Sequence, residues 1–88
     1  MGDEDLTISE FQEMIRKAYY HRDKQRGIDK TFMWFVEEVG ELARAIKNKN
    51  IENIEEEIAD VAAWLISLAN LLNIDMRTAI IKKYGNSI

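Results

Sequence analysis

Residues 58–72 read IADVAAWLISLANLL, an apolar run whose only polar members are Asp60, Ser67 and Asn70. The run is too short for a membrane span, which needs about 17–25 residues, and a carboxylate inside a span would be costly. It reads instead as a helix that is apolar on nearly every side, and such a helix is covered from more than one direction. Because the chain has only 88 residues, we expect a second subunit to supply part of that cover.

The composition is that of one small acidic domain over residues 1–88. The 16 Asp and Glu outnumber the 12 Lys and Arg, and a net charge of -4 argues against a nucleic-acid partner. There is no cysteine and only one histidine, His21, so disulfides and cysteine-based metal sites are excluded. The opening stretch MGDEDLTISE lacks the basic and apolar regions of a signal peptide, and we expect a cytoplasmic protein with no membrane partner.

Apolar residues recur with a period near 3.6 along the chain, which predicts an all-α fold. A first helix is expected from Thr7, which can form a capping box with Glu10, to Gly27. The same pattern predicts three further helices, at about 29–48, 50–72 and 75–85.

Short connections between these helices predict a compact bundle. Asn50 or Asn53 would cap the third helix, and Asp75 would cap the fourth. Asn73 would end the third helix in a left-handed conformation. The second and third helices are joined by a short loop, so they should pack antiparallel as a helical hairpin. We expect homodimerisation to complete a four-helix bundle core around this hairpin.

Two pairs of carboxylates lie on the hairpin. Glu38 and Glu41 are three residues apart, as are Glu57 and Asp60, and residues at that spacing share one face of a helix. One antiparallel register brings three pairs face to face: Glu38 with Asp60, Glu41 with Glu57, and Trp34 with Trp64. Four carboxylates in a partly desolvated groove repel one another unless a cation compensates. Magnesium, with manganese as a substitute, suits oxygen ligands and also binds substrate phosphates.

Simpler explanations exist for these residues. Glutamates are common on solvated helix faces, and Glu41 could pair with Arg44 instead of a metal. Two tryptophans at helical spacing are as often core residues as ligand-stacking ones. A di-iron bundle would need two Glu-x-x-His pairs, which a chain with one histidine cannot supply.

The segments VEEVGELARAI (36–46) and EEEIADVAAWL (55–65) resemble the MazG-like nucleotide pyrophosphohydrolases, within the all-α nucleoside triphosphate pyrophosphatase superfamily. The family signature E-E-x-x-E, a spacer and E-x-x-D is matched by five acids: Glu37, Glu38, Glu41, Glu57 and Asp60. The stretch NIDMRTAIIKKYGN (73–86) is similar to the family's G-I-D-x-x-x-A segment and its Lys-x-x-x-Asn ending, matched by Lys82 and Asn86. The resemblance covers roughly residues 8–86.

The resemblance implies a magnesium-dependent hydrolase that cleaves nucleoside triphosphates between the α and β phosphates and releases a nucleoside monophosphate and pyrophosphate. Its expected role is nucleotide-pool house-cleaning, as a homodimer or homotetramer. It implies metal ligation by four acids: Glu38, Glu41, Glu57 and Asp60. By position, Glu38 and Glu41 are the candidates to take a proton from the attacking water. We expect Glu37 and Glu56 beside the metal ligands rather than bound to the metal.

Basic, amide and aromatic side chains are the expected substrate contacts: Lys82, Asn86, Trp64, Trp34 and Lys30. By the family match, Lys82 and Asn86 would contact phosphate or sugar, the alternative being a solvated helix end. Lys30, like Arg22 and Arg26, either meets phosphates or is a solvated charge. The tryptophans could stack on a base, which is worth about 1–3 kcal/mol, and Trp64 is the better placed of the two.

Rival functions stay open on the sequence. The phosphoribosyl-ATP pyrophosphohydrolase of histidine synthesis shares the superfamily pattern, but that family tends to carry His at the position of Trp64. A specialised dUTP or dCTP hydrolase is closer still. A non-catalytic helical interaction module would be expected to lack a metal ligand, and none of the five signature acids is missing.

Overall fold

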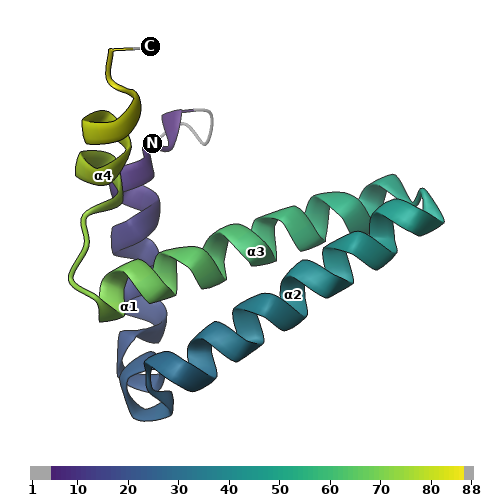
Figure 1. The fold of residues 1–88 in the computed structure, drawn as a ribbon, viewed down its shortest axis with the longest axis horizontal. Coiled ribbons are helices and arrows are strands. Elements are labelled where there is room, and N and C mark those ends of the chain that lie inside the picture. Colours follow the sequence, from purple (N-terminus) through teal and green to yellow (C-terminus); the bar gives the residue numbers. More distant parts are fainter. Residues whose placement is uncertain (1–4, 87–88) are drawn as a thin grey trace.

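The computed structural model describes residues 5–86, which form four α-helices: α1 (Ile8–Arg26), α2 (Ile28–Asn48), α3 (Ile51–Leu71) and α4 (Met76–Tyr84). Within that range there is no strand, which confirms the expected all-α class. α2 and α3 run antiparallel side by side, α1 crosses the open end of this hairpin, and α4 lies beside α1 (Figure 1). The predicted single domain and the expected lack of a signal peptide also involve residues 1–4 and 87–88, which lie outside the described range.

The helix ends follow local capping signals. The Thr7 hydroxyl accepts a hydrogen bond from the Glu10 N–H at 3.0 Å, and the Glu10 carboxylate accepts one from the Thr7 N–H at 2.7 Å. The predicted capping box is therefore present. Asn50, rather than Asn53, caps α3, and Asp75 caps α4 as expected.

Gly27 alone makes the turn between α1 and α2. Its φ of 88° lies in the left-handed region that favours glycine, and its N–H donates to the Asp23 carbonyl at 2.9 Å. α1 ends at Arg26 and α2 begins at Ile28, slightly earlier than the sequence predicts. This sharp corner brings the last turn of α1 against the first turns of α2.

The start of α4 turns away from the hairpin. Asn73 is left-handed, as predicted, with φ 56°. α3 and α4 are bent by 99° relative to each other, and α4 packs against α1 instead. The chain by itself is therefore more open than the compact bundle that its short loops favour. No single helix within residues 5–86 is long and apolar enough to cross a membrane; α3 and α4 together would pass on length and composition alone, with that bend between them.

A buried hydrogen-bond network joins α1, α3 and the start of α4. The Gln12 amide donates to Asn70 Oδ1 and to the Ile74 carbonyl, both at 2.9 Å. Its oxygen accepts from the Met76 N–H at 2.9 Å, and Arg16 donates to Asn70 Oδ1 at 3.0 Å. Gln12 and Asn70 are 5% and 0% exposed, so one glutamine satisfies polar groups of three segments that would otherwise be buried unpaired.

One chain buries little apolar surface. The buried hydrophobic side chains among the described residues are Ile15, Ala45, Ile66, Leu68 and Ala69. Leu65 on α3 and Leu72 directly after it remain exposed, as does Phe32 on α2. All three line one groove of about 640 Å³, between the start of α2, the end of α3 and the segment before α4. Part of the apolar run is therefore uncovered in one chain, and its cover by a second subunit stays a prediction.

We predict that Gln12→Ala lowers the free energy of unfolding by about 2–4 kcal/mol, because the Ile74 carbonyl and the Met76 N–H lose their partner. Urea denaturation followed by circular dichroism, at one protein concentration, measures the change. Gln25→Ala, at an exposed position of the same helix, is the matched control and should stay within about 0.5 kcal/mol of the wild type. Equal effects of the two substitutions would contradict the role of the network.

Candidate metal centre

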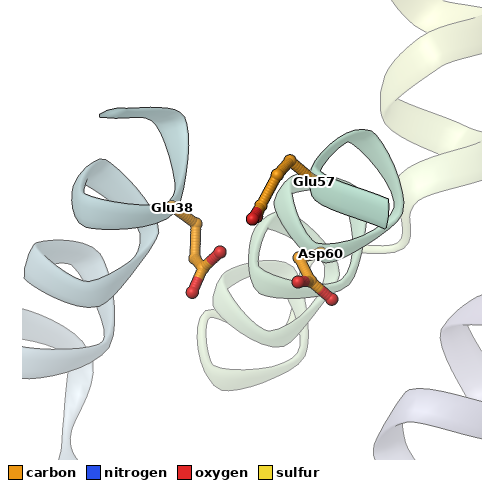
Figure 2. A group of neighbouring side chains, drawn as sticks. All are labelled: Glu38, Glu57 and Asp60. Carbon is orange, nitrogen blue, oxygen red and sulfur yellow. The ribbon is translucent and has the colours of Figure 1, made fainter. Parts of the chain in front are cut away.

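Three carboxylates converge between α2 and α3. Glu38, Glu57 and Asp60 each place one oxygen within 4.8 Å of the other two. Figure 2 shows Glu38 extending from α2 toward the two side chains of α3. The helical spacing of Glu57 and Asp60 and the antiparallel register produce this arrangement, as the sequence predicts.

The three groups are electrostatically unfavourable together. Burial is the main cause that raises the pKa of Glu38 above its ordinary value, followed by the close approach of the Glu57 carboxyl group and the charges of Asp60 and Glu41. Glu57 Oε1 is buried and has no hydrogen-bond partner among the described residues. A divalent cation with a preference for oxygen would relieve both problems, so this donor set fits magnesium or manganese.

Glu41, the fourth expected ligand, lies outside the group of three. Its carboxylate forms an ion pair with Arg44, with Oε1 3.0 Å from Nη1, on an exposed face. Glu41 and Glu57 nevertheless line one small pocket between α2 and α3, so the predicted register holds for this pair as well. The structure brings three of the four expected ligands together and leaves the fourth beside them, bound to an arginine.

The two tryptophans also face each other. The ring centroids of Trp34 and Trp64 are 5.6 Å apart and the rings meet edge to face at 75°, which confirms the third predicted pair. Arg26, at the end of α1, lies over both rings, with its guanidinium carbon 4.7 Å and 4.9 Å from the two centroids. This cation–π packing ties α1 to the hairpin.

Arg26 is held in place by buried groups. Its Nη1 donates to Asp23 Oδ1 at 2.9 Å and to Thr31 Oγ1 at 3.3 Å. Asp23 and Thr31 are 2% and 0% exposed. Asp23 was not predicted from the sequence. Its only signal is an Asp-x-x-Arg spacing near a helix end, which is common on solvated helices.

A cavity of about 240 Å³ adjoins the carboxylates. Asp60 belongs both to its wall and to the group of three. Two helices supply the whole wall: Tyr19, Arg22, Asp23 and Arg26 from α1, and Asp60, Ala63, Trp64 and Ser67 from α3. Trp64 therefore reaches the cavity, whereas Trp34 does not line it. Tyr19 was missed by the sequence analysis, because its place depends on how α1 crosses α3.

The other expected residues do not belong to the group of three carboxylates. Glu37 and Glu56 are exposed neighbours of the acids in the sequence. Lys30 is exposed in the first turn of α2 and does not line the cavity. Lys82 and Asn86 are exposed on α4 and in the turn after it, and they do not line the cavity of their own chain.

The fold and this site define an all-α protein with a candidate metal centre and an adjoining cavity. Residues 26–86 match the MazG nucleotide pyrophosphohydrolase domain. Because this segment is more than half of the chain, the protein belongs to the MazG nucleotide pyrophosphohydrolase family, which is metal-dependent. No curated protein gives a significant match. Residues 8–25 of α1, which supply much of the cavity wall, precede the matched segment.

We predict that Glu38→Gln raises the Tm of the metal-free protein by a few degrees, because it removes one of three repelling carboxylates. At this half-buried position the repulsion is worth less than about 1 kcal/mol, and 1 kcal/mol shifts Tm by about 4–8 °C in a domain of this size. Differential scanning calorimetry in EDTA measures the shift. The control is Glu55→Gln, at an exposed position on the same hairpin. A Tm for Glu38→Gln at or below that of the control would contradict the repulsion.

The raised pKa of Glu38 also predicts a pH dependence. A carboxyl group whose pKa is raised by folding favours the folded state most when protonated. The metal-free protein should therefore lose stability as the pH rises above the ordinary value of 4.5 and through the folded-state pKa. Magnesium binds the deprotonated groups, so the Tm gain at a fixed magnesium concentration should grow as the pH rises from the ordinary value of 4.5 through the folded-state pKa of Glu38. A gain that is independent of pH would contradict this prediction.

Proposed function

We propose that this protein hydrolyses ribo- or deoxyribonucleoside triphosphates between the α and β phosphates, releasing a nucleoside monophosphate and pyrophosphate. The observation that carries the proposal is the convergence of Glu38, Glu57 and Asp60 in a chain of the MazG family. The unpartnered oxygen of Glu57 and the raised pKa of Glu38 support a divalent cation between them. A house-cleaning role in the cytoplasm, where triphosphates and magnesium are both present, is part of this proposal.

Each acid has a role in the proposed reaction. Glu38, Glu57 and Asp60 would hold the cation, magnesium by preference and manganese as a substitute. Magnesium, when bound, neutralises phosphate charge and makes water easier to deprotonate. Water attacks phosphorus in line, its proton passes to a carboxylate and pyrophosphate leaves. Glu41, held only by the exposed Arg44, can turn to join the ligands or to take this proton, and Glu38 is the other candidate acceptor.

The other expected residues also have roles in the proposed reaction. Lys82 and Asn86 do not line the cavity of their own chain, so their contact with phosphate or sugar would come from a second subunit. Lys30 would meet phosphates from the first turn of α2. Glu37 and Glu56, exposed beside the acids, would orient water rather than bind the cation.

We predict metal-dependent release of pyrophosphate from a panel of NTPs and dNTPs, with magnesium or manganese and not with EDTA. Glu38→Gln and Asp60→Asn should each lower kcat/KM about a hundredfold or more, because the metal stabilises the transition state by several kcal/mol. Glu55→Gln is the matched control, since its carboxylate is exposed and outside the group of three.

Phosphorus NMR of the products identifies the bond that breaks. A monophosphate with pyrophosphate supports the proposal, whereas a diphosphate with orthophosphate would contradict cleavage between the α and β phosphates. If no nucleotide turns over in a folded, magnesium-binding protein, the nucleotide assignment fails, and phosphoribosyl-ATP and then protein partners become the substrates and ligands to test.

The exposed groove supports a homodimer or homotetramer, in which a second copy of the chain covers Phe32, Leu65 and Leu72. Buried apolar residues are few, and a chain of 88 residues gains most from burying such a face. Light scattering after size-exclusion chromatography should give a multiple of the 10.3 kDa chain mass. Leu65→Glu should shift the protein toward monomer, and Met14→Glu, exposed on α1 outside the groove, should not. A monomeric wild type would contradict the proposal.

A further inference from the structure

The cavity beside Asp60 contains a carboxylate that the proposed reaction does not use. Asp23 lies in the cavity wall at 2% exposure, and its Oδ1 accepts a hydrogen bond from Arg26 at 2.9 Å. Its other oxygen, Oδ2, is buried and has no hydrogen-bond partner within residues 5–86. A buried acceptor without a partner is costly, so a ligand that supplies a donor would be favoured here.

The missing partner of Asp23 must be a hydrogen-bond donor, because an ion-paired carboxylate only accepts. A phosphate offers acceptors and negative charge, so it cannot be the partner of Asp23 Oδ2, even though two arginines line the cavity. Arg26 does not attract a phosphate to Asp23, because its Nη1 is bound to Asp23 and Thr31 and its guanidinium lies over the tryptophan rings.

Two acidic residues of the cavity wall differ in exposure, and we use this difference to orient a nucleotide. Asp60 is exposed and belongs to the group of three carboxylates, whereas Asp23 is buried. A nucleotide with its phosphates at the metal centre therefore directs its base, the part furthest from them, toward Asp23. The volume of about 240 Å³ is below the range of about 300–1,000 Å³ for drug-sized ligands, which suits a single base. Trp64 and Ala63 supply apolar wall for its ring.

We propose that Asp23 makes this enzyme select bases with an exocyclic amino group, cytosine or adenine, over their oxo counterparts, uracil and hypoxanthine. The amino group donates toward Asp23 Oδ2, whereas an oxo group at the same position would set two acceptors against each other in a buried site, and the neighbouring ring N–H could donate only if the base shifted. A site built to bond a substrate donor rejects the analogue that lacks it far more strongly than an apolar pocket does. The inference rests on the proposed hydrolase function and narrows its substrate class.

A ribose hydroxyl is the other donor that a nucleotide could bring to Asp23, and matched substrates separate the two sources. CTP and UTP differ on one edge of the base, where cytosine has an amino group beside a bare ring nitrogen and uracil has an oxo group beside a ring N–H, and ATP and ITP differ in the same way. CTP and dCTP differ only in the 2′ hydroxyl. We expect kcat/KM to favour CTP over UTP and ATP over ITP by about 10- to 100-fold, the range for a hydrogen bond to a charged acceptor. CTP and dCTP should be alike.

Asp23→Asn tests the residue itself. The amide can donate as well as accept, so the amino preference should collapse or invert while hydrolysis continues. Glu13→Gln, a mostly exposed carboxylate on the same helix that is paired with Arg16, is the matched control and should keep the preference. Equal rates for the amino and oxo members of both pairs in the wild type would overturn the inference while leaving the hydrolase proposal intact. A 2′-hydroxyl preference that disappears in Asp23→Asn would overturn it in favour of the sugar.

Two further measurements keep the test decisive if Asp23→Asn does not fold or no triphosphate turns over. Ala63→Leu narrows the cavity without changing a carboxylate, so it should raise KM for CTP at unchanged manganese affinity, and an unchanged KM would overturn the inference. Quenching of tryptophan fluorescence by CMP and UMP measures cavity binding without hydrolysis, because Trp64 lines the wall. Tighter binding of CMP supports the role of Asp23, and equal affinities overturn it.

Discussion

The antiparallel register of α2 and α3 is the constraint on which the candidate site depends. A slip of one residue on either helix would rotate its side chains by about 100° and separate Glu38 from the acids of α3. This register is supported by packing at the open end of the hairpin, where Trp34 meets Trp64 and Arg26 covers both rings. The same contacts bring α1 against α3 and so create the cavity beside the acids.

The arrangement of the site lowers the stability of the metal-free fold. Glu38 and Glu57 are held close enough for burial and charge to raise the pKa of Glu38, and Asp23 and Glu57 each keep a buried oxygen without a partner in the described chain. These are groups that a cation and a nucleoside can satisfy, which is how pre-organised binding sites differ from packed cores. An amino-base preference would direct the proposed house-cleaning toward surplus nucleotides rather than deaminated ones.

Local signals predicted most of the secondary structure, because the Thr7 capping box and the Asp75 cap involve residues only three apart. The register of the acids was also predictable, since a short loop leaves an antiparallel hairpin few alternatives. The crossing of α1 over α3 depends instead on long-range contacts such as the network of Gln12, so the place of Asp23 in the cavity wall was not predictable. The position of the Glu41 carboxylate was not predictable. It pairs with Arg44 here, and its other expected partner, a metal ion, is not encoded in the sequence.

A crystal structure with manganese is the most direct test of the metal centre, because anomalous scattering locates the ion without reference to activity. The account predicts an anomalous peak between α2 and α3, coordinated by oxygens of Glu38, Glu57 and Asp60. Glu41 should then have turned away from Arg44 toward the ion or its water. Manganese bound only elsewhere, with these three carboxylates free and the fold retained, would contradict the account.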